Sequence, residues 1–376
     1  MAVDTNMPPT APTIRDFDYP DFYRAMVERE HLQVAKHEVK WTEQHGNSDS
    51  KVDVLLNFGC NARQTPHLMR EAVAVFETLG VSFAAVAGQQ FCCGKPYSNN
   101  GLKEAAKGVV DASVRRMASY HPERAIQWCS ACEMQFQDVV IPEIGIHFQS
   151  DGLAAYLIEK LDSMKTKPWK KVLKTKVVVH GHLGEHRVRD GHPPIAMDLL
   201  TRIPGVEVIG FAKNQALNLC DNAGPKIAKI NTAEYNAAQK ELEGYLDESG
   251  ADTIVTLYHG CTRELGKFAN EKVRVRHYIS LVAEALGVSK PDRFSEYWRL
   301  GEVEKVLEAS RPNWESWDID EAEARRLVHR YFIPSYTPAP DCPCNGECTR
   351  TGASFLTAHK IDRLQQLPMV AQKDLV

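Results

Sequence analysis

The alternation of short apolar strands with helices constrains this chain most strongly. The first half alternates strands at 52–57, 81–88 and 125–128 with helices at about 66–79 and 102–120. The same order recurs in strands at 176–180, 206–211 and 253–259, with helices near 194–202 and 226–247. Strands separated by helices of this length predict βαβ units and parallel sheets. The sequence therefore predicts an α/β chain built from two copies of one unit.

These copies set the expected domain boundaries, with a junction near 149–170. We expect an N-terminal extension at 1–50, a first domain at 51–165, a second at 170–288, and a helical, cysteine-containing region at 289–376. A chain of 376 residues is long enough for two domains. Its core is therefore large enough to be stable without disulfide cross-links.

Charge and hydropathy exclude several function classes. Lys and Arg number 45 and Asp and Glu 49, and a net charge of -4 argues against non-specific nucleic-acid binding. No apolar stretch reaches the roughly 18 residues of a membrane span, and the N-terminus does not resemble a secretory signal. We therefore expect a cytoplasmic protein with no transmembrane segment. No glycine-rich nucleotide motif follows any strand, so a nucleotide cofactor has no support.

Five of the ten cysteines follow the three strands of the first unit. They are Cys60, Cys92, Cys93, Cys129 and Cys132. Because the carboxyl ends of parallel strands share one edge, three loops would deliver five thiolates to one place. A tetrahedral zinc site takes four ligands, whereas thiolates in this number suit an iron–sulfur assembly. The alternative is five buried or paired cysteines without metal. Gly94, after the adjacent pair, is expected to form a turn with positive φ.

This pattern resembles the CCG domain found in the disulfide-cleaving subunit of heterodisulfide reductase and in its relatives. The resemblance rests on Cys60, the Cys92-Cys93-Gly94 triplet and the closing Cys129-x-x-Cys132 pair, and it extends over about 51–288. It implies two duplicated Rossmann-like CCG domains. It also implies a non-cubane [4Fe-4S] cluster, held by the five cysteines, that cleaves a disulfide in one-electron steps. The candidate catalytic residues are Cys92, Cys93 and Lys95, the last as a side chain lining a pocket.

The second copy departs from this pattern. Aligning the halves places His182 opposite Cys60, with the remaining counterparts at Cys220, Asp221, Tyr258 and Cys261. Mixed Cys, His and Asp ligands suit zinc or a single iron. Three interpretations stay open: an altered metal site on His182, Cys220, Asp221 and Cys261, a site without metal, or a modified cluster. Asp221 and Tyr258 are alternatively acid–base groups facing the intact cluster.

The C-terminal region holds three further cysteines, Cys342, Cys344 and Cys348. A closed zinc site needs a fourth ligand, which His359 or a partner protein would supply. The alternative is a surface loop with reactive thiols. The aromatic residues at 297–332 are either a docking surface or internal packing.

The resemblance implies an iron–sulfur subunit of a heterodisulfide-reductase-like complex that acts on disulfides or dithiols. The degenerate second copy favours relatives from sulfur oxidisers, whose substrate would be a protein-bound lipoate sulfur carrier. The chain lacks a CxxCxxCxxxCP run. We therefore expect a ferredoxin-like iron–sulfur subunit and a flavin-containing subunit as partners. The alternatives are a non-catalytic electron-transfer or scaffold subunit, or the CCG subunit of another oxidoreductase, such as one acting on lactate, glycolate or succinate.

Overall fold

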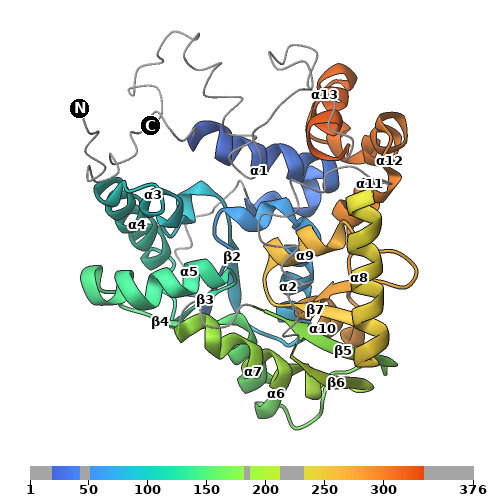
Figure 1. Cartoon of the computed structure of the whole chain (residues 1–376). Helices are drawn as coiled ribbons and strands as arrows, with labels where there is room; N and C mark the ends of the chain where they lie inside the picture. Colours follow the sequence, from blue (N-terminus) through green and yellow to red (C-terminus); the bar gives the residue numbers. More distant parts are fainter. Residues whose placement is uncertain (1–18, 43–50, 182–186, 212–232, 334–376) are drawn as a thin grey trace, which may run out of the picture.

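Two parallel β-sheets of four strands each form the centre of the structure (Figure 1). The computed structural model describes residues 19–42, 51–181, 187–211 and 233–333. The strand order is β2-β1-β3-β4 in the first sheet and β6-β5-β7-β8 in the second. Each unit thus repeats the same order around its own first strand. The prediction of an α/β fold with duplicated, Rossmann-like units is confirmed.

All paired strands in both sheets run parallel. The first sheet contains β1 (Val54–Asn57), β2 (Phe83–Val86), β3 (Arg124–Gln127) and β4 (Gln149–Gly152). The second contains β5 (Thr175–His180), β6 (Val206–Phe211), β7 (Thr253–Thr256) and β8 (Arg274–His277). Every residue of β1 and β7 is buried, as expected for central strands covered on both faces.

Helices connect and cover the strands of each unit. The first unit has the short helices η4 (Asn61–Gln64) and η5 (Gln89–Phe91), and the helices α2 (Pro66–Thr78), α3 (Lys95–Ser98), α4 (Lys103–Ala118), α5 (Ser130–Gln135), η6 (Phe136–Ile144) and α6 (Leu153–Ser163). The second has α7 (Arg187–Thr201), α8 (Ala233–Ser249), α9 (His259–Gly266) and α10 (Tyr278–Leu286). Pro66 begins α2, where the missing backbone N–H costs no helical hydrogen bond.

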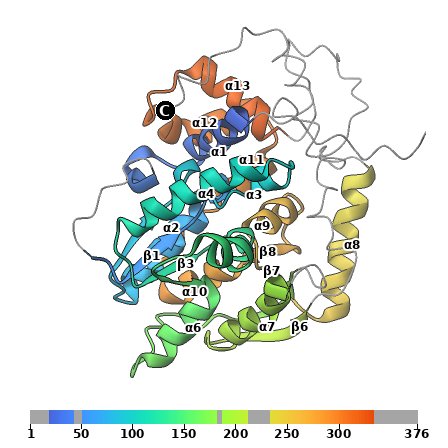
Figure 2. The same cartoon turned by 90° about the vertical axis from the view of Figure 1, so that its left-hand side faces the viewer.

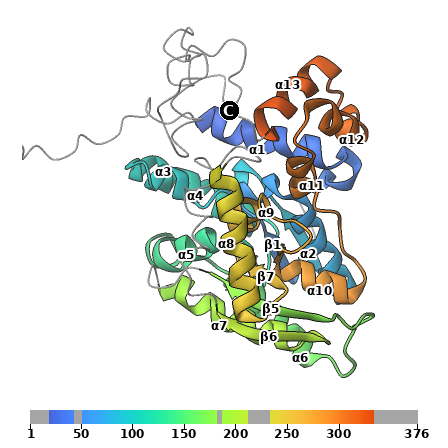
Figure 3. The ribbon, with the colours of Figure 1, turned by 45° about the vertical axis from the view of Figure 1, so that its right-hand side comes forward.

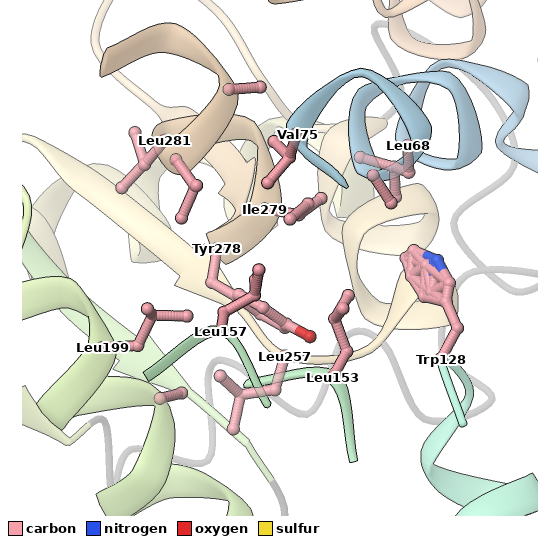
Figure 4. Close-up of a cluster of buried hydrophobic side chains, with 14 of the residues drawn as sticks. Leu68, Val75, Trp128, Leu153, Leu157, Leu199, Leu257, Tyr278, Ile279 and Leu281 are labelled. Atoms are coloured by element: carbon pink, nitrogen blue, oxygen red, sulfur yellow. The ribbon is translucent and has the colours of Figure 1, made fainter. Parts of the chain in front are cut away.

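One hydrophobic core joins the two units. Helices α2 and α6 of the first unit pack against α10 and α7 of the second, respectively. Figure 4 shows Leu68 and Val75 of α2 near Ile279 of α10, with Trp128 at one end of the cluster. Burial of this shared apolar surface holds the two units together and fixes the loops at their carboxyl edges.

A separate helical group forms around the N-terminal helix α1 (Tyr19–Gln33). Helix α1 packs against α12 (Val303–Glu315) and α13 (Glu321–Tyr331), beside α11 (Arg293–Leu300) (Figures 2 and 3). Two short helices follow it, η2 (Lys36–Glu38) and η3 (Lys40–Thr42). The aromatic residues of this region are buried, with Tyr297 and Phe332 both at 0% exposure. They pack internally, so the docking interpretation is wrong for them.

Three elements lie where the sequence predicts a linker or no element. Strand β4 and helix α6 occupy the segment expected to join the units, and β8 pairs with β7. Helix α1 ends at Gln33, earlier than the expected helix at 21–40, and the part of the expected helix before Ala233 lies outside the described residues. No helix within the described ranges has the length and apolar character that crossing a membrane requires.

Candidate functional site

Three loops at the carboxyl edge of the first sheet carry the five predicted cysteines. Cys60 follows β1, Cys92 and Cys93 follow β2 and η5, and Cys129 precedes α5, which contains Cys132. Four are buried, with exposures of 6% or less, and Cys129 is partly exposed. All five are reduced thiols. The structure therefore brings together the complete set that the sequence predicted.

The five thiols form one continuous chain of contacts. Cys60 contacts Cys92, and Cys92 contacts Cys93. Cys93 contacts Cys132, which contacts Cys129. No cysteine of the set stands apart, so the sulfurs lie within the reach of one multinuclear group.

These contacts divide the thiols into two classes. Hydrogen bonds from Cys60 and Cys93 lower the pKa of Cys92 to about 3, and a hydrogen bond from Cys132 lowers the pKa of Cys129 well below its usual value. The hydrogen bond to Cys92, together with burial, raises the pKa of Cys60. The hydrogen bond to Cys129 likewise raises the pKa of Cys132. For Cys93, a hydrogen bond from Cys132 lowers the pKa, but the bond to Cys92 and burial outweigh it and the pKa rises.

Two donors outside the set reach the sulfur of Cys92. The hydroxyl of Tyr23, on α1, lies 3.2 Å from Cys92 Sγ. The backbone N–H of Gly94 lies 3.4 Å from the same sulfur. Donors of this kind stabilise a thiolate, which is the form that binds metal. Sequence reasoning missed Tyr23, because residues so far apart in the chain share no local pattern.

Two glycines allow the thiol loops to pack closely. Gly59 has φ +65°, and a Cβ there would lie 2.8 Å from Cys132 Sγ. Gly94 has φ +78°, and its Cβ would lie 2.6 Å from the side chain of Val110. Only glycine meets both requirements, the left-handed backbone and the missing Cβ. The positive φ predicted at Gly94 is confirmed.

The second unit also lines this site. His259, the first residue of α9, contacts Cys129 and contributes to the lowering of the pKa of that thiol. Its ring lies edge-on to Trp128, with centroids 5.9 Å apart. His192 lies 2.9 Å from Glu133, the residue after Cys132, and 3.3 Å from the hydroxyl of Tyr258. Side chains of the degenerate copy therefore border the intact cysteine set.

The expected second site is described only in part. Cys261 is buried at 6% exposure on α9, whereas His182, Cys220 and Asp221 lie outside the described residues, as do Cys342, Cys344 and Cys348. Among the described residues, no group of three or more His, Cys, Asp or Glu side chains has the arrangement that would hold a metal ion.

Strand register refines the alignment of the two units. Asn57 pairs with Gln127, and His180 pairs with Thr256 at the matching place in the second sheet. His180 therefore corresponds to Asn57, one residue earlier than the sequence alignment placed it.

Lys95 begins α3 directly after Gly94 and is partly exposed. No contact of its side chain defines a pocket, so its role stays a prediction.

The cysteine set meets the chemical requirements of an iron–sulfur cluster. Clusters are held by thiolates, and their properties depend on burial and on hydrogen bonds to sulfur. Here four sulfurs are shielded from water, and Cys92 accepts hydrogen bonds from Tyr23 and Gly94. The residues present therefore fit such a group.

Comparison with known proteins identifies the same segment. Residues 54–137, which include all five cysteines, match the family model of the cysteine-rich domain CCG. A subunit of the dihydromethanophenazine:CoB–CoM heterodisulfide reductase of Methanosarcina barkeri is 23% identical over 69% of this chain and 65% of its own length. The Methanosarcina acetivorans protein of the same name is 25% identical over 68% and 64%. The matched part of the chain thus spans just under two thirds of these relatives.

A second kind of relative is shorter. Lactate utilization protein A 2 of Bacillus cereus is 22% identical over 59% of this chain and 93% of its own length.

Proposed function

Because this chain is a CCG-domain protein related to subunits of heterodisulfide reductase, we propose that it is an iron–sulfur oxidoreductase subunit that carries out disulfide/dithiol redox chemistry. The observation that carries the proposal is the continuous set of five thiols at one sheet edge. We assign them as ligands of a non-cubane [4Fe-4S] cluster. When bound, that group would supply one-electron steps and an iron for a substrate sulfur.

The chain's own residues have distinct roles in this proposal. The five cysteines hold the cluster, and Cys92 and Cys93 are the pair nearest the reacting sulfur. Lys95 remains the candidate for attracting an anionic substrate. The packed second unit, through His259 beside Cys129, limits the access of water to the thiols.

For the substrate we propose a disulfide or dithiol carried by lipoate on a partner protein, in sulfur oxidation. The support is the degenerate second copy, which leaves one complete cysteine set in place of two. We also propose an altered zinc or iron site on His182, Cys220, Asp221 and Cys261. Its test is the zinc and iron content of the purified chain, compared with that of Cys261→Ser.

The relatives named as subunits support a hetero-complex. We propose a ferredoxin-like iron–sulfur subunit and a flavin-containing subunit as partners, because the chain has no ferredoxin run of its own. We place the complex in the cytoplasm, where grouped thiols stay reduced.

A second candidate function is the CCG subunit of another oxidoreductase. The observation that favours it is the coverage of lactate utilization protein A 2, which the match spans over 93% of its length. A non-catalytic electron-transfer or scaffold role in a heterodisulfide-reductase-like complex is the remaining alternative. Turnover with lactate, in place of a disulfide, would support the second candidate.

The experiment that separates these functions replaces Cys93 by Ala in this chain alone. We expect disulfide-dependent turnover of the complex to fall by at least about 100-fold, since a residue acting at the reacting centre affects the transition state directly. The control is reduction of an artificial acceptor at the flavin-containing partner, which should not change. Unchanged disulfide turnover would show that another subunit performs the reaction.

A further inference from the structure

Helix α1 lies over the cysteine site. Tyr19, Tyr23 and Met26 on α1 form one buried cluster with Cys60 and Cys92. The ring of Tyr19 also stacks on Tyr97, with centroids 4.2 Å apart. The N-terminal segment, which the sequence presents as an extension, therefore supplies one wall of the site. This helix lies outside the matched CCG range.

Buried contacts fix α1 to the loop that follows Cys60. Glu30, at 0% exposure, forms an ion pair with Arg63 of η4. The side-chain amide of Gln33 donates to the backbone carbonyl of Gln64, also in η4, at 3.1 Å. Because η4 begins at the residue after Cys60, these contacts set the position of α1 relative to the thiols.

Tyr23 uses this fixed position to donate a hydrogen bond to sulfur. Its side chain is 7% exposed, and its hydroxyl lies 3.2 Å from Cys92 Sγ. Burial raises the pKa of the phenol, so the hydroxyl keeps its proton and acts as the donor. The bond lies in an apolar environment, where a hydrogen bond to a thiolate is stronger than in water.

We propose that Tyr23 is a positioning residue that raises the reduction potential of the cluster by donating this hydrogen bond to the sulfur of Cys92. The proposal rests on the proposed iron–sulfur function. Reduction adds negative charge to a cluster and its sulfurs, so a donor to sulfur favours the reduced form. Removing the donor therefore shifts the potential to more negative values.

The test compares Tyr23→Phe with Tyr331→Phe in the cluster-loaded chain. Tyr331 donates its hydroxyl to Glu28 on the same helix, so its loss also removes one anchor of α1 without touching a cysteine. The measurement is an anaerobic redox titration of each protein followed by EPR, with iron content and thermal unfolding recorded in parallel.

We expect Tyr23→Phe to shift the midpoint potential to more negative values, while Tyr331→Phe and the wild type agree. Equal potentials for Tyr23→Phe and the wild type, at equal iron content, would overturn the role of Tyr23. An equal shift in both variants would also overturn it, because the effect would then come from loosening α1. A wild-type chain that holds no iron contradicts the proposed function itself and is distinguishable from both results.

If Tyr23→Phe does not load its cluster, Tyr23→His supplies a second variant with a donor. A wild-type-like potential in Tyr23→His supports donation to sulfur as the cause. A potential displaced to more negative values in Tyr23→His, at full iron content, would overturn it.

Discussion

The imidazole of His192 and the carboxylate of Glu133 lie 2.9 Å apart and join the two units beside the cysteine site. Glu133 is on α5, one residue after Cys132, and His192 is on α7 of the second unit. The other nitrogen of His192 lies 3.3 Å from the hydroxyl of Tyr258, the residue before α9. The degenerate copy therefore supports the helix that carries Cys132.

We predict that Glu133→Ala lowers the free energy of unfolding by about 1–3 kcal/mol, because it leaves the half-buried His192 without this partner. Glu133→Gln keeps a hydrogen-bonding group and should cost less. Urea unfolding of the single variants and of the Glu133→Ala, His192→Ala double variant gives the coupling between the two residues. Strictly additive losses would contradict a direct interaction.

The buried pair of Glu30 and Arg63 gives a second prediction. Arg63→Ala should destabilise the chain by about 3–5 kcal/mol, because it leaves a carboxylate buried at 0% exposure without its partner charge. Chemical denaturation measures the loss. The matched control replaces both residues, as Glu30→Leu with Arg63→Met, and should recover most of the stability. A double variant as unstable as Arg63→Ala would show that the loss does not come from an unpaired charge.

Gly94 gives a prediction about cluster loading. Gly94→Ala combines φ +78° with a Cβ 2.6 Å from Val110, so the loop of Cys92 and Cys93 must move. We expect iron content to fall to less than half, with a stability loss of about 1–3 kcal/mol. The control is Gly108→Ala within α4, where a Cβ meets nothing within 4 Å and should stabilise the helix slightly. Full iron loading in Gly94→Ala would be incompatible with the packing described.

His31 gives a prediction about pH. Its ring stacks on Trp317, with centroids 3.9 Å apart, and burial followed by the charges of Arg63 and Lys36 lowers its pKa to about 3. The folded chain keeps His31 neutral, whereas the unfolded chain binds a proton below about pH 6.5. The free energy of unfolding should therefore fall as pH decreases from about 6.5 toward 3, by up to about 1.4 kcal/mol per pH unit from this residue.

His31→Phe keeps an aromatic ring against Trp317 and removes the titrating group. Denaturation curves between pH 4 and 7 should then show a smaller slope of stability against pH. Some slope remains, because burial also lowers the pKa of His277 well below its usual value. An identical slope in the wild type and His31→Phe would rule out the buried neutral state of His31.

The sequence predicts the central strands and the cysteine edge because both depend on local signals. Apolar runs such as Val177–Val179 mark buried parallel strands, and each cysteine loop follows such a run. Strand β4, with the sequence QSDG, has neither apolar residues nor alternation, so only its pairing with β3 makes it a strand. Strand β8, RVRH, is similarly short and charged.

Contacts between distant segments could not be predicted in this way. Tyr23 and Cys92 are brought together by the packing of α1, which depends on a buried ion pair and on the C-terminal helices. The contact of His259 with Cys129 likewise requires the relative placement of the two units. Neither relationship leaves a periodic pattern in the sequence, and an unaligned single chain carries no other signal for them.

The central claim is that Cys60, Cys92, Cys93, Cys129 and Cys132 hold one iron–sulfur cluster. The direct measurement is the iron and sulfide content of the anaerobically purified chain, with EPR, for the wild type and for Cys129→Ala. We predict about four irons and four sulfides per chain in the wild type, as a [4Fe-4S] cluster requires, and a lost or altered EPR signal in the variant. A wild-type chain without iron, or a variant with the same iron content and spectrum, would contradict the claim.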